Sequence, residues 1–295
     1  MRLFAGSSHP RLAEEVALQL GISPGRSRIE HFPDGEIGVQ ILEEVQGKEI
    51  FLLQSPAHRP NHYLMELLVM VDALKRAGAR RITALLPYYP YARQDRRDDK
   101  LVPITARLVA DMLQAAGVCR VVTLGLHTDQ IEGFFSIPVQ NLSGRSLLVS
   151  ALRELQLKSP VVVSTDIGGN RLARKFAEDL DAHLAFVHKK RLNAERVEAE
   201  ALIGRVEGRE VVLVDDICST GHTLEMAARI CRERGARLVV GAVTHGLFSG
   251  PDPIAGLDRF FVTDSIAQPA GRKETVVSCA PLLAALLKKD EGICN

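Results

Sequence analysis

Residues 211–223 read VVLVDDICSTGHT and decide the fold of this chain. The β-branched run at 211–214 predicts a buried strand, and the small polar residues at 218–222 predict a turn. The following segment repeats apolar residues at helical spacing (Leu224, Ala227, Ala228 and Cys231), which predicts a helix. A buried strand that passes through a tight turn into a helix is typical of an α/β protein with a parallel sheet.

Further apolar runs of the same kind occur along the whole chain and alternate with segments of helical period. The runs are IFLLQS, ITALLPYY, RVVTLGL, VVVSTD, LAFVHK, EVVLVDD and RLVVGAV. Strands that are apolar on both faces indicate a parallel sheet covered by helices on both sides. Residues 61–78 predict one of these helices, with Asn61 as its cap and Gly78 as the left-handed residue after its end.

One helix-to-strand junction recurs in both halves. RAGARRITALL at 76–86 resembles RERGARLVVGAV at 232–243, and AAGVCRVVTLGL at 115–126 is a looser copy. A single copy is a generic α/β junction, but three copies favour two similar α/β domains, each with a mainly parallel sheet flanked by helices. We place the first domain at residues 1–145 and the second at 146–295.

Composition excludes several classes of function. Charged residues make up 25% of the 295 residues and the formal net charge is +1, so no basic footprint for nucleic acid is expected. No apolar run approaches the ~20 residues of a membrane span, and MRLFAG does not open a signal peptide, so we expect a cytoplasmic protein that does not bind membranes. The five cysteines show no CxxC spacing, which gives no sign of a disulfide framework or a zinc site.

The carboxylates at the end of the 211–214 strand indicate a ligand site. Asp215 and Asp216 are predicted at the carboxyl edge of the sheet, where open α/β folds bind ligands. The turn ahead of the next helix is a seat for phosphate, with Thr220 and Thr223 as hydroxyl donors and Gly221 permitting close approach. Acids beside a phosphate suit the vicinal hydroxyls of a sugar phosphate. The alternative is that an acid or serine of the stretch only caps the helix.

This stretch resembles the phosphoribosyl-pyrophosphate (PRPP) binding motif of type I phosphoribosyltransferases and of ribose-phosphate diphosphokinases (PRPP synthetases). Further stretches resemble motifs of the second family, in the family's order and over nearly the whole chain, and a transferase has no use for most of them. They are FPDGE at 32–36, PYYPYARQDRR at 87–97, HTDQIEGFF at 127–135, TDIGG at 165–169 and HKKR at 188–191. The resemblance implies two type I phosphoribosyltransferase-like domains, the first on the ATP side and the second binding ribose 5-phosphate. It also implies a homo-oligomer, either a dimer or a multiple of dimers.

The implied reaction moves the β,γ-diphosphoryl group of ATP to the C1 hydroxyl of ribose 5-phosphate. The products are PRPP, a precursor for nucleotide biosynthesis, and AMP. Mg²⁺ is the implied cofactor, with His127 and Asp166 at the metal-linked positions. Lys189, Arg191 and Arg93 match the catalytic basic residues, which stabilise charge on the transferred group.

The resemblance implies substrate contacts in both halves. Asp34, Gly35 and Glu36 match contacts to ATP, as do Arg93, Gln94 and Asp95. The positions that match ribose 5-phosphate contacts are Asp215, Asp216, Ser219, Thr220, Gly221, His222 and Thr223. Arg191 also matches such a contact, as an alternative to its catalytic role. The charged residues 93–100 resemble a loop that closes over the nucleotide, and Tyr88, Tyr89 and Tyr91 are expected to pack.

Several positions depart from the family pattern. Gly125, Ser136 and Gln140 stand where many members have acids, which puts an auxiliary metal role in doubt. Ser219 replaces a common Asp and His222 a Gly; His222 either faces solvent or adds a pH-dependent contact. Two other functions stay open. One is a phosphoribosyltransferase, against which the ATP-side motifs argue, and the other is a non-catalytic regulatory homologue, which the lost acids alone support.

Overall fold

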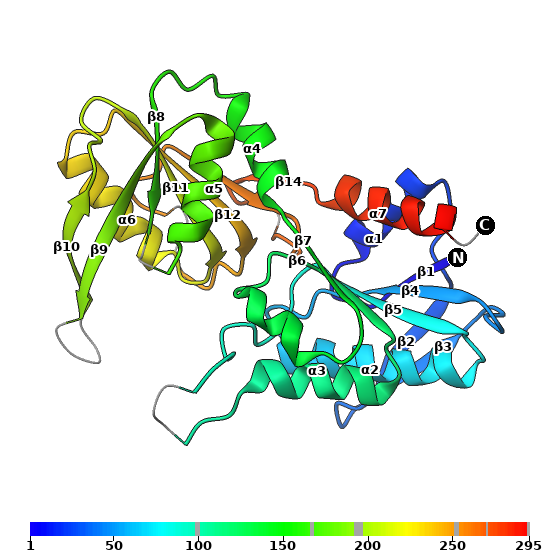
Figure 1. Cartoon of the computed structure of the whole chain (residues 1–295). Helices are drawn as coiled ribbons and strands as arrows, with labels where there is room; N and C mark the ends of the chain where they lie inside the picture. The colour runs from blue at the N-terminus through cyan, green and yellow to red at the C-terminus, as the bar shows by residue number, and fades with distance from the viewer. Residues whose placement is uncertain (98–100, 166–167, 192–196, 251–253, 270, 294–295) are drawn as a thin grey trace. The chain divides into compact units, whose positions relative to one another are not determined.

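The computed structural model describes residues 1–97, 101–165, 168–191, 197–250, 254–269 and 271–293, with the side chains of 188–200 and 290–293 outside the description. The chain forms two compact units (Figure 1). Unit 1 contains Met1–Ser143, Ser265–Ala267 and Ser278–Asn295, and unit 2 contains Gly144–Asp264 and Gln268–Val277. No helix among the described residues combines the length and apolar character needed to cross a bilayer.

Unit 1 is built on a parallel sheet with the strand order β1-β4-β5-β6-β7. A separate antiparallel hairpin joins β2 to β3. The strands are β1 (Arg2–Ala5), β2 (Ser27–His31), β3 (Ile37–Ile41), β4 (Glu49–Leu53), β5 (Arg81–Leu86), β6 (Arg120–Leu124) and β7 (Val139–Leu142). The helices are α1 (Pro10–Leu20), α2 (Pro60–Arg76), α3 (Thr105–Ala116), the 3₁₀ helix η1 (Asp129–Phe134) and α7 (Ala280–Ile293).

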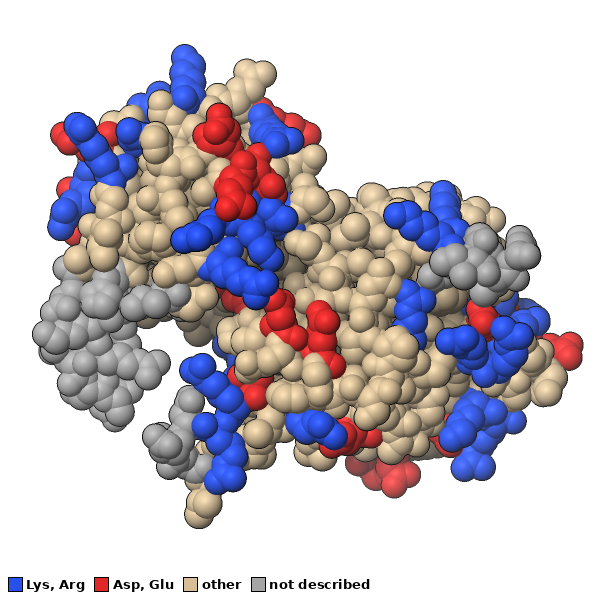
Figure 2. All heavy atoms as spheres, in the orientation of Figure 1, with Lys and Arg blue, Asp and Glu red and all other residues tan. Residues whose placement is uncertain are grey.

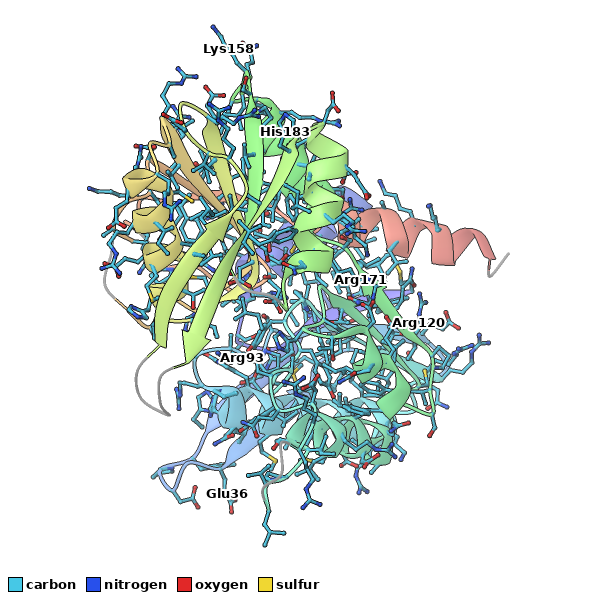
Figure 3. All side chains as sticks on the ribbon, turned by 60° about the vertical axis from the view of Figure 1, so that its left-hand side comes forward. Glu36, Arg93, Arg120, Lys158, Arg171 and His183 are labelled. Atoms are coloured by element: carbon cyan, nitrogen blue, oxygen red, sulfur yellow. The ribbon has the colours of Figure 1, made fainter. Side chains whose placement is uncertain are left out.

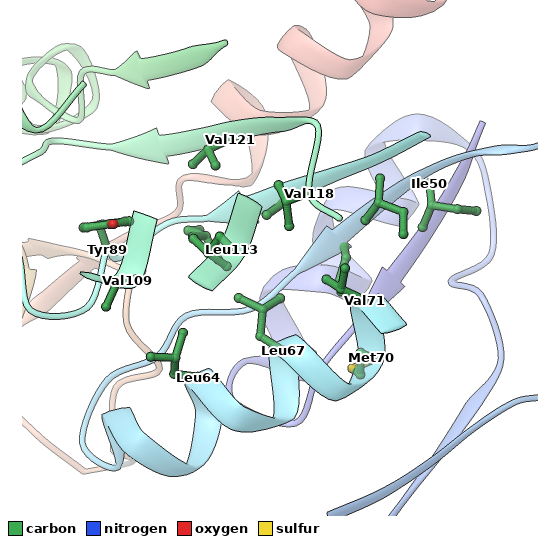
Figure 4. Packing of buried hydrophobic residues seen from close by; sticks show 14 of the residues in the cluster. Ile50, Leu64, Leu67, Met70, Val71, Tyr89, Val109, Leu113, Val118 and Val121 are labelled. Carbon is green, nitrogen blue, oxygen red and sulfur yellow. The ribbon is translucent and has the colours of Figure 1, made fainter. Parts of the chain in front are cut away.

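The core of unit 1 forms where α2 and α3 cover the sheet. Leu67, Val71 and Leu113 are fully buried against strand residues such as Val121 (Figure 4). The predicted helix at 61–78 is confirmed, but its cap is not Asn61. Pro60 takes the first helical position after Arg59, because its fixed φ suits the first turn and its missing N–H costs nothing there.

Unit 2 is built on a larger sheet with the strand order β10-β9-β8-β11-β12-β13-β14, in which only the β9–β10 pair is antiparallel. The strands are β8 (Pro160–Ser164), β9 (His183–Arg191), β10 (Val197–Ile203), β11 (Glu210–Cys218), β12 (Leu238–Gly246), β13 (Arg259–Thr263) and β14 (Thr275–Val277). The helices are α4 (Arg145–Arg153), α5 (Asn170–Leu180) and α6 (His222–Glu233).

Strand β11 shows why its apolar run is continuous. Val211 and Leu213 pack into the cluster that contains α6, whereas Val212 and Val214 pack into the cluster that contains α4 and α5. Alternate residues of a strand point to opposite faces, so a strand with helices on both sides needs apolar residues throughout. The predicted fold class, parallel sheets flanked by helices, is confirmed in both units.

The recurring junction found in the sequence has the same geometry in both units. Gly78 precedes β5 with φ +86° and Gly235 precedes β12 with φ +81°. The Gly78 carbonyl accepts from Gly47 N at 2.8 Å, and the Gly235 carbonyl accepts from Gly208 N at 2.8 Å. The same backbone bond at corresponding places supports the prediction of two similar domains.

The division of the chain differs from the predicted one at its C-terminal end. The first break falls at residues 143/144, close to the predicted 145/146, but residues from Ser278 onward belong to unit 1 rather than to the second domain. Helix α7 packs beside α1, and Ser278 Oγ donates to Glu15 Oε2 at 2.8 Å (Figure 1). The physical reason is the apolar face of α7, including Leu283 and Leu287, which is buried in unit 1. An apolar face in the sequence does not say which partner covers it.

Candidate active site

The two aspartates of the opening stretch lie on an extension of β11. The strand runs to Cys218, four residues beyond the predicted end. Its neighbour β8 stops at Ser164, which pairs with Val214, whereas β12 continues beside β11 as far as Gly246. Residues 215–218 are therefore flanked by β12 but extend beyond β8. Asp215 and Asp216 stand there half-buried, at the carboxyl edge where the sequence placed them.

Asp215 is held by the neighbouring strand end. Its Oδ2 accepts a hydrogen bond from Thr165 Oγ1 at 2.8 Å, and its Oδ1 accepts from the backbone N of Asp216 at 2.9 Å. Asp216 Oδ1 accepts from Ile217 N at 2.9 Å. These contacts fix the direction of both carboxylates. Neither caps the helix that follows, so the alternative role of Asp216 as a helix cap is wrong.

The turn from β11 into α6 is built around Gly221. This residue is the N-cap of α6 with φ +84°, and a Cβ placed on it would lie 2.9 Å from Ile254 Cγ1. Glycine is thus required both by backbone conformation and by space. Because glycine has no side chain to accept hydrogen bonds, Gly221 caps none of the first backbone N–H groups of α6. His222 N makes only a long bond to Thr220 Oγ1, so the start of this helix can still offer N–H groups to a ligand or water. Such a helix start favours a phosphate group.

A loop to which sequence reasoning assigned no role in the site, residues 247–250, forms the back of this turn. Ser249 N donates to Ser219 O at 2.9 Å, and Leu247 N donates to Cys218 O at 2.8 Å. A Cβ on Gly250 would lie 2.0 Å from Thr220 O, so only glycine fits there. Gly250 is a residue that sequence reasoning missed, since SGPDP at 249–253 reads as an ordinary loop.

The side chains of the turn differ in exposure. Ser219 and Thr223 are half-buried, whereas Thr220 and His222 are exposed. Thr220 Oγ1 accepts a long hydrogen bond of 3.4 Å from His222 N. Cys218, by contrast, is buried. Its burial, and to a smaller extent the nearby negative charge of Asp215, raise the pKa of its thiol to about 12. Cys218 is therefore a packing residue, as predicted, with no reactive thiolate at neutral pH.

In unit 1, FPDGE forms the turn of the β2–β3 hairpin. Gly35 has φ +93° and donates to Phe32 O at 2.9 Å, and Asp34 Oδ1 accepts from Glu36 N at 3.1 Å. Asp34, Gly35 and Glu36, the predicted ATP contacts in this turn, are all exposed, and Glu36 marks the tip of the hairpin in Figure 3. The exposed acids of a tight turn are presented to solvent with their backbone fixed.

The loop after β5 exposes Arg93 to solvent, whereas Gln94 and Asp95 hydrogen-bond the loop to neighbouring elements. Arg93 is exposed (Figure 3), and so are Arg96 and Arg97 of the same loop, where basic side chains gather on the face drawn in Figure 2. Gln94 Oε1 accepts from Thr105 Oγ1 at 2.6 Å at the start of α3. Asp95 is buried, and its Oδ2 accepts from Thr128 Oγ1 at 2.7 Å and Gln130 Nε2 at 2.9 Å. The Asp95 carboxylate thus anchors the segment that carries His127.

His127 itself is exposed in the loop that follows β6. Gly125, two residues earlier, has φ +61° and donates to Leu142 O at 2.8 Å. Asp is among the few non-glycine residues that tolerate this conformation, so the exchange of Asp for Gly keeps the backbone. At another departure, Arg120 donates to Gln140 Oε1, so this amide has a structural partner. The expectation that tyrosines pack is confirmed for Tyr88 and Tyr89, which are buried.

Three predicted residues lie wholly or partly outside the described part of the chain. Asp166 lies outside the described residues, and Lys189 and Arg191 lie on β9 with their side chains outside the description. The structure brings Asp215, Asp216, Ser219, Thr220, Gly221, His222 and Thr223 together on one strand-to-helix turn. In unit 1 it places Arg93, Gln94 and Asp95 on one loop, which Asp95 ties to the His127 segment.

These features define a class of protein with phosphoribosyltransferase domains. Residues 140–271 match the model of the phosphoribosyl transferase domain, and residues 1–117 match the model of the N-terminal domain of ribose phosphate pyrophosphokinase. The chain belongs to the ribose-phosphate pyrophosphokinase family.

Full-length relatives agree with this assignment. The chain is 45% identical over 299 residues to a ribose-phosphate pyrophosphokinase of Helicobacter hepaticus, covering 100% of this chain and 96% of the relative. It is 46% identical to the enzyme of the same name from Vibrio parahaemolyticus, covering 98% and 95%. The crystal structure of phosphoribosylpyrophosphate synthetase from Mycobacterium smegmatis superposes with a TM-score of 0.91 at 42% identity, covering 97% of both chains.

Proposed function

We propose that this chain transfers the β,γ-diphosphoryl group of ATP to the C1 hydroxyl of ribose 5-phosphate, giving PRPP and AMP. The observation that carries the proposal is the β11–α6 turn. It combines two oriented carboxylates, Asp215 and Asp216, with a glycine N-cap that leaves helix N–H groups for a phosphate. A sugar phosphate offers vicinal hydroxyls and a phosphate on one small molecule, which matches both halves of this turn.

The reaction requires the protein mainly to position the two substrates and to neutralise their negative charge. Phosphoryl-type transfers pass through transition states whose charge is spread over non-bridging oxygens, so electrostatic stabilisation supplies much of the rate. We assign Arg93 to the ATP side, where it is exposed beside residues braced by Asp95. Lys189 and Arg191 are assigned to the transferred group. Holding both substrates in line removes the entropic cost of their encounter, and no side chain need act as a general base.

Mg²⁺ is the proposed cofactor. Carboxylate oxygens are the donors this ion prefers, and the oriented pair Asp215 and Asp216 satisfies that chemistry in unit 2. His127 and Asp166 remain the residues proposed to take part in holding the metal. Bound there, the ion would offset the charge that ATP and ribose 5-phosphate bring together.

One product assay tests the function. Purified protein incubated with ATP, Mg²⁺ and ribose 5-phosphate is expected to form AMP and PRPP in equal amounts. ADP with a monophosphorylated sugar would contradict diphosphoryl transfer. Consumption of PRPP with a nitrogenous base and release of pyrophosphate would instead support a phosphoribosyltransferase. Nucleotide binding without any product would support a regulatory homologue.

A variant tests the assigned catalytic lysine. Lys189→Ala is expected to lower kcat by ~10²- to 10³-fold while sparing ribose 5-phosphate binding, since one electrostatic contact to the transition state is typically of this size. Lys158→Ala is the matched control, because Lys158 is exposed elsewhere in unit 2 (Figure 3). Equal turnover in the two variants would remove Lys189 from the mechanism.

Assembly and location are further parts of the proposal. We expect a homo-oligomer, a dimer or a multiple of dimers, formed by a protein of the cytoplasm. Light scattering coupled to size-exclusion chromatography measures the mass, and a monomer at micromolar concentration would contradict this part alone.

A further inference from the structure

Three side chains with metal-binding atoms meet in unit 1, and none of them has a role assigned above. His31 is the last residue of β2, and His62 and Glu66 lie on the first turns of α2. Their ligand atoms all lie within 4.8 Å of one another. The rings of His31 and His62 are 5.0 Å apart between centroids, and His62 Nε2 lies 4.0 Å from Glu66 Oε2. The i, i+4 spacing places His62 and Glu66 on one face of the helix.

Glu66 is held in a fixed orientation. It is fully buried, and its Oε1 accepts from Ser7 N at 2.6 Å and from Gln54 Nε2 at 2.7 Å. Its Oε2 accepts from Ser7 Oγ at 2.6 Å and faces His62 on its other side. A carboxylate oxygen offers two lone pairs, so Oε2 keeps one after the bond to Ser7. Hydrogen bonds behind a carboxylate are the usual support of a metal ligand.

His62 stands beside this carboxylate with its side chain only 17% exposed, so few water molecules compete for its ring nitrogen. Arg59, at the start of α2, is a cost to any cation bound here, although its side chain is exposed to solvent, which screens its charge.

We infer that His31, His62 and Glu66 form a binding site for a transition-metal dication of the zinc type. Two imidazoles and one carboxylate are a donor set that zinc accepts with a fourth position left to water. Mg²⁺ is expected to bind weakly to such a site, because this ion prefers oxygen donors to imidazole nitrogens. Bonds of ~2.0–2.1 Å require ligand atoms about 3.3 Å apart. The separations here are 4.0 Å between His62 Nε2 and Glu66 Oε2 and at most 4.8 Å within the cluster, so both imidazole rings must shift inward, by no more than about 1.5 Å. The exposure of His31 leaves room for the shift of its ring.

The site joins two elements that the sequence keeps apart. A metal on His31 would fix the end of β2 to the start of α2, immediately before the hairpin turn of residues 32–36. That turn carries Asp34, Gly35 and Glu36. The expected consequence of occupancy is a more rigid hairpin base, measured as slower backbone hydrogen exchange at residues 32–36.

The test is a metal titration of the full chain after removal of metals with a chelator. Zn²⁺ is titrated against a chromophoric chelator, with excess Mg²⁺ present and no substrate. Wild type is expected to bind one zinc ion at this site, and His31→Gln and His62→Gln to bind it at least ~10²-fold more weakly, since each removes a ligand. Ser7→Ala, which removes a support of Glu66, is expected to weaken binding by ~10-fold. His183→Gln is the control, because His183 is an exposed histidine of unit 2 (Figure 3).

Cobalt gives a second readout that does not depend on affinity. Co²⁺ in place of zinc is expected to give a visible absorption band in wild type and in His183→Gln, and to lose it in His62→Gln. Three results would overturn the inference: no zinc binding by wild type, equal weakening by His183→Gln, or displacement of zinc by Mg²⁺. None of them depends on whether PRPP is formed, so the two proposals stand or fall separately.

Discussion

Two strand-to-helix turns occupy equivalent places in the two units and have opposite characters. In unit 2, β11 passes through residues 219–221 into α6, and in unit 1, β4 passes through residues 54–59 into α2. Each strand is followed in its sheet by the strand of the recurring junction, β12 or β5. The unit 2 turn holds half-buried carboxylates and exposed polar side chains. The unit 1 turn begins with Gln54 and Ser55, which are buried.

The unit 1 turn is filled by its own side chains. Gln54 Nε2 donates to Glu66 Oε1 at 2.7 Å and to Tyr63 O at 3.1 Å, and Gln54 Oε1 accepts from Ser8 N at 3.1 Å. Ser55 N donates to Ser8 Oγ at 2.7 Å. The same fold position thus serves as an open cradle in one unit and as a closed polar core in the other. Because its own side chains fill this turn, we expect the ligand-binding residues of unit 1 to lie on its β2–β3 hairpin and on the loop after β5.

The largest expected effect breaks the closed turn. Gln54→Leu keeps the side-chain size but leaves the buried Glu66, the Tyr63 carbonyl and the Ser8 N–H short of partners. Each buried group left unpaired costs about 1–3 kcal/mol, so we expect a loss of ~3–5 kcal/mol of stability, measured by thermal and denaturant unfolding.

The matched control for this prediction is Gln19→Leu, at an exposed position of α1. It is expected to change stability by no more than ~0.5 kcal/mol. Equal stability of the two variants would mean that the polar core of unit 1 contributes little. The contrast between the two turns would then be one of shape only.

The next effect breaks the open turn. Gly221→Ala introduces a Cβ 2.9 Å from Ile254 at a residue with φ +84°, so the turn must shift. Strain of this kind costs ~1–3 kcal/mol, and we expect ribose 5-phosphate to bind about 10- to 100-fold more weakly, by calorimetry or by KM. ATP binding is expected to be unchanged.

Gly208→Ala separates backbone strain from the steric effect. Gly208 has φ +67°, but a Cβ there would meet nothing within 4 Å. This variant shares the conformational cost and is expected to keep ribose 5-phosphate affinity. If both variants bind the sugar phosphate as wild type does, the cradle is not at Gly221.

The contrast between the turns also explains what the sequence predicted well. The unit 2 turn is continuous in the chain and made by the backbone, so residues 211–223 specify its strand, glycine and helix together. In unit 1 the bracing groups are far apart: Asp95 meets Thr128, and Glu66 meets Ser7. Such pairs depend on tertiary contacts that no local pattern specifies. The partner of α7 and the role of Gly250 were missed for the same reason.

A moderate effect is expected at the bracing carboxylate of unit 1. Asp95→Asn removes the charge that accepts hydrogen bonds from Thr128 and Gln130. Hydrogen bonds to charged groups contribute ~1.5–3 kcal/mol, and part of this loss should appear as a rise of about 10-fold in the KM for ATP. Asp111→Asn is the control, because Asp111 forms only an exposed pair with Arg107 on α3 among its described contacts. A rise in the KM for ribose 5-phosphate alone would contradict the assignment of this loop to the ATP side.

The smallest effect is expected at Cys218, which lies directly beneath the open turn. Its thiol has a pKa raised to about 12, first by burial and then by Asp215, so the reactive thiolate is scarce at neutral pH and increases only as pH approaches that value. Iodoacetamide is therefore expected to modify the half-buried Cys119 well before Cys218 in native protein, as read by mass spectrometry of peptides. Cys218→Ala should change kcat by less than ~3-fold, because it removes one buried sulfur and no contact to substrate. Rapid labelling of Cys218 with loss of activity that ribose 5-phosphate prevents would instead show a thiol within the cradle. The turn of unit 2 would then present a reactive side chain as well as backbone groups. Its difference from the turn of unit 1, which is built from side chains, would be smaller.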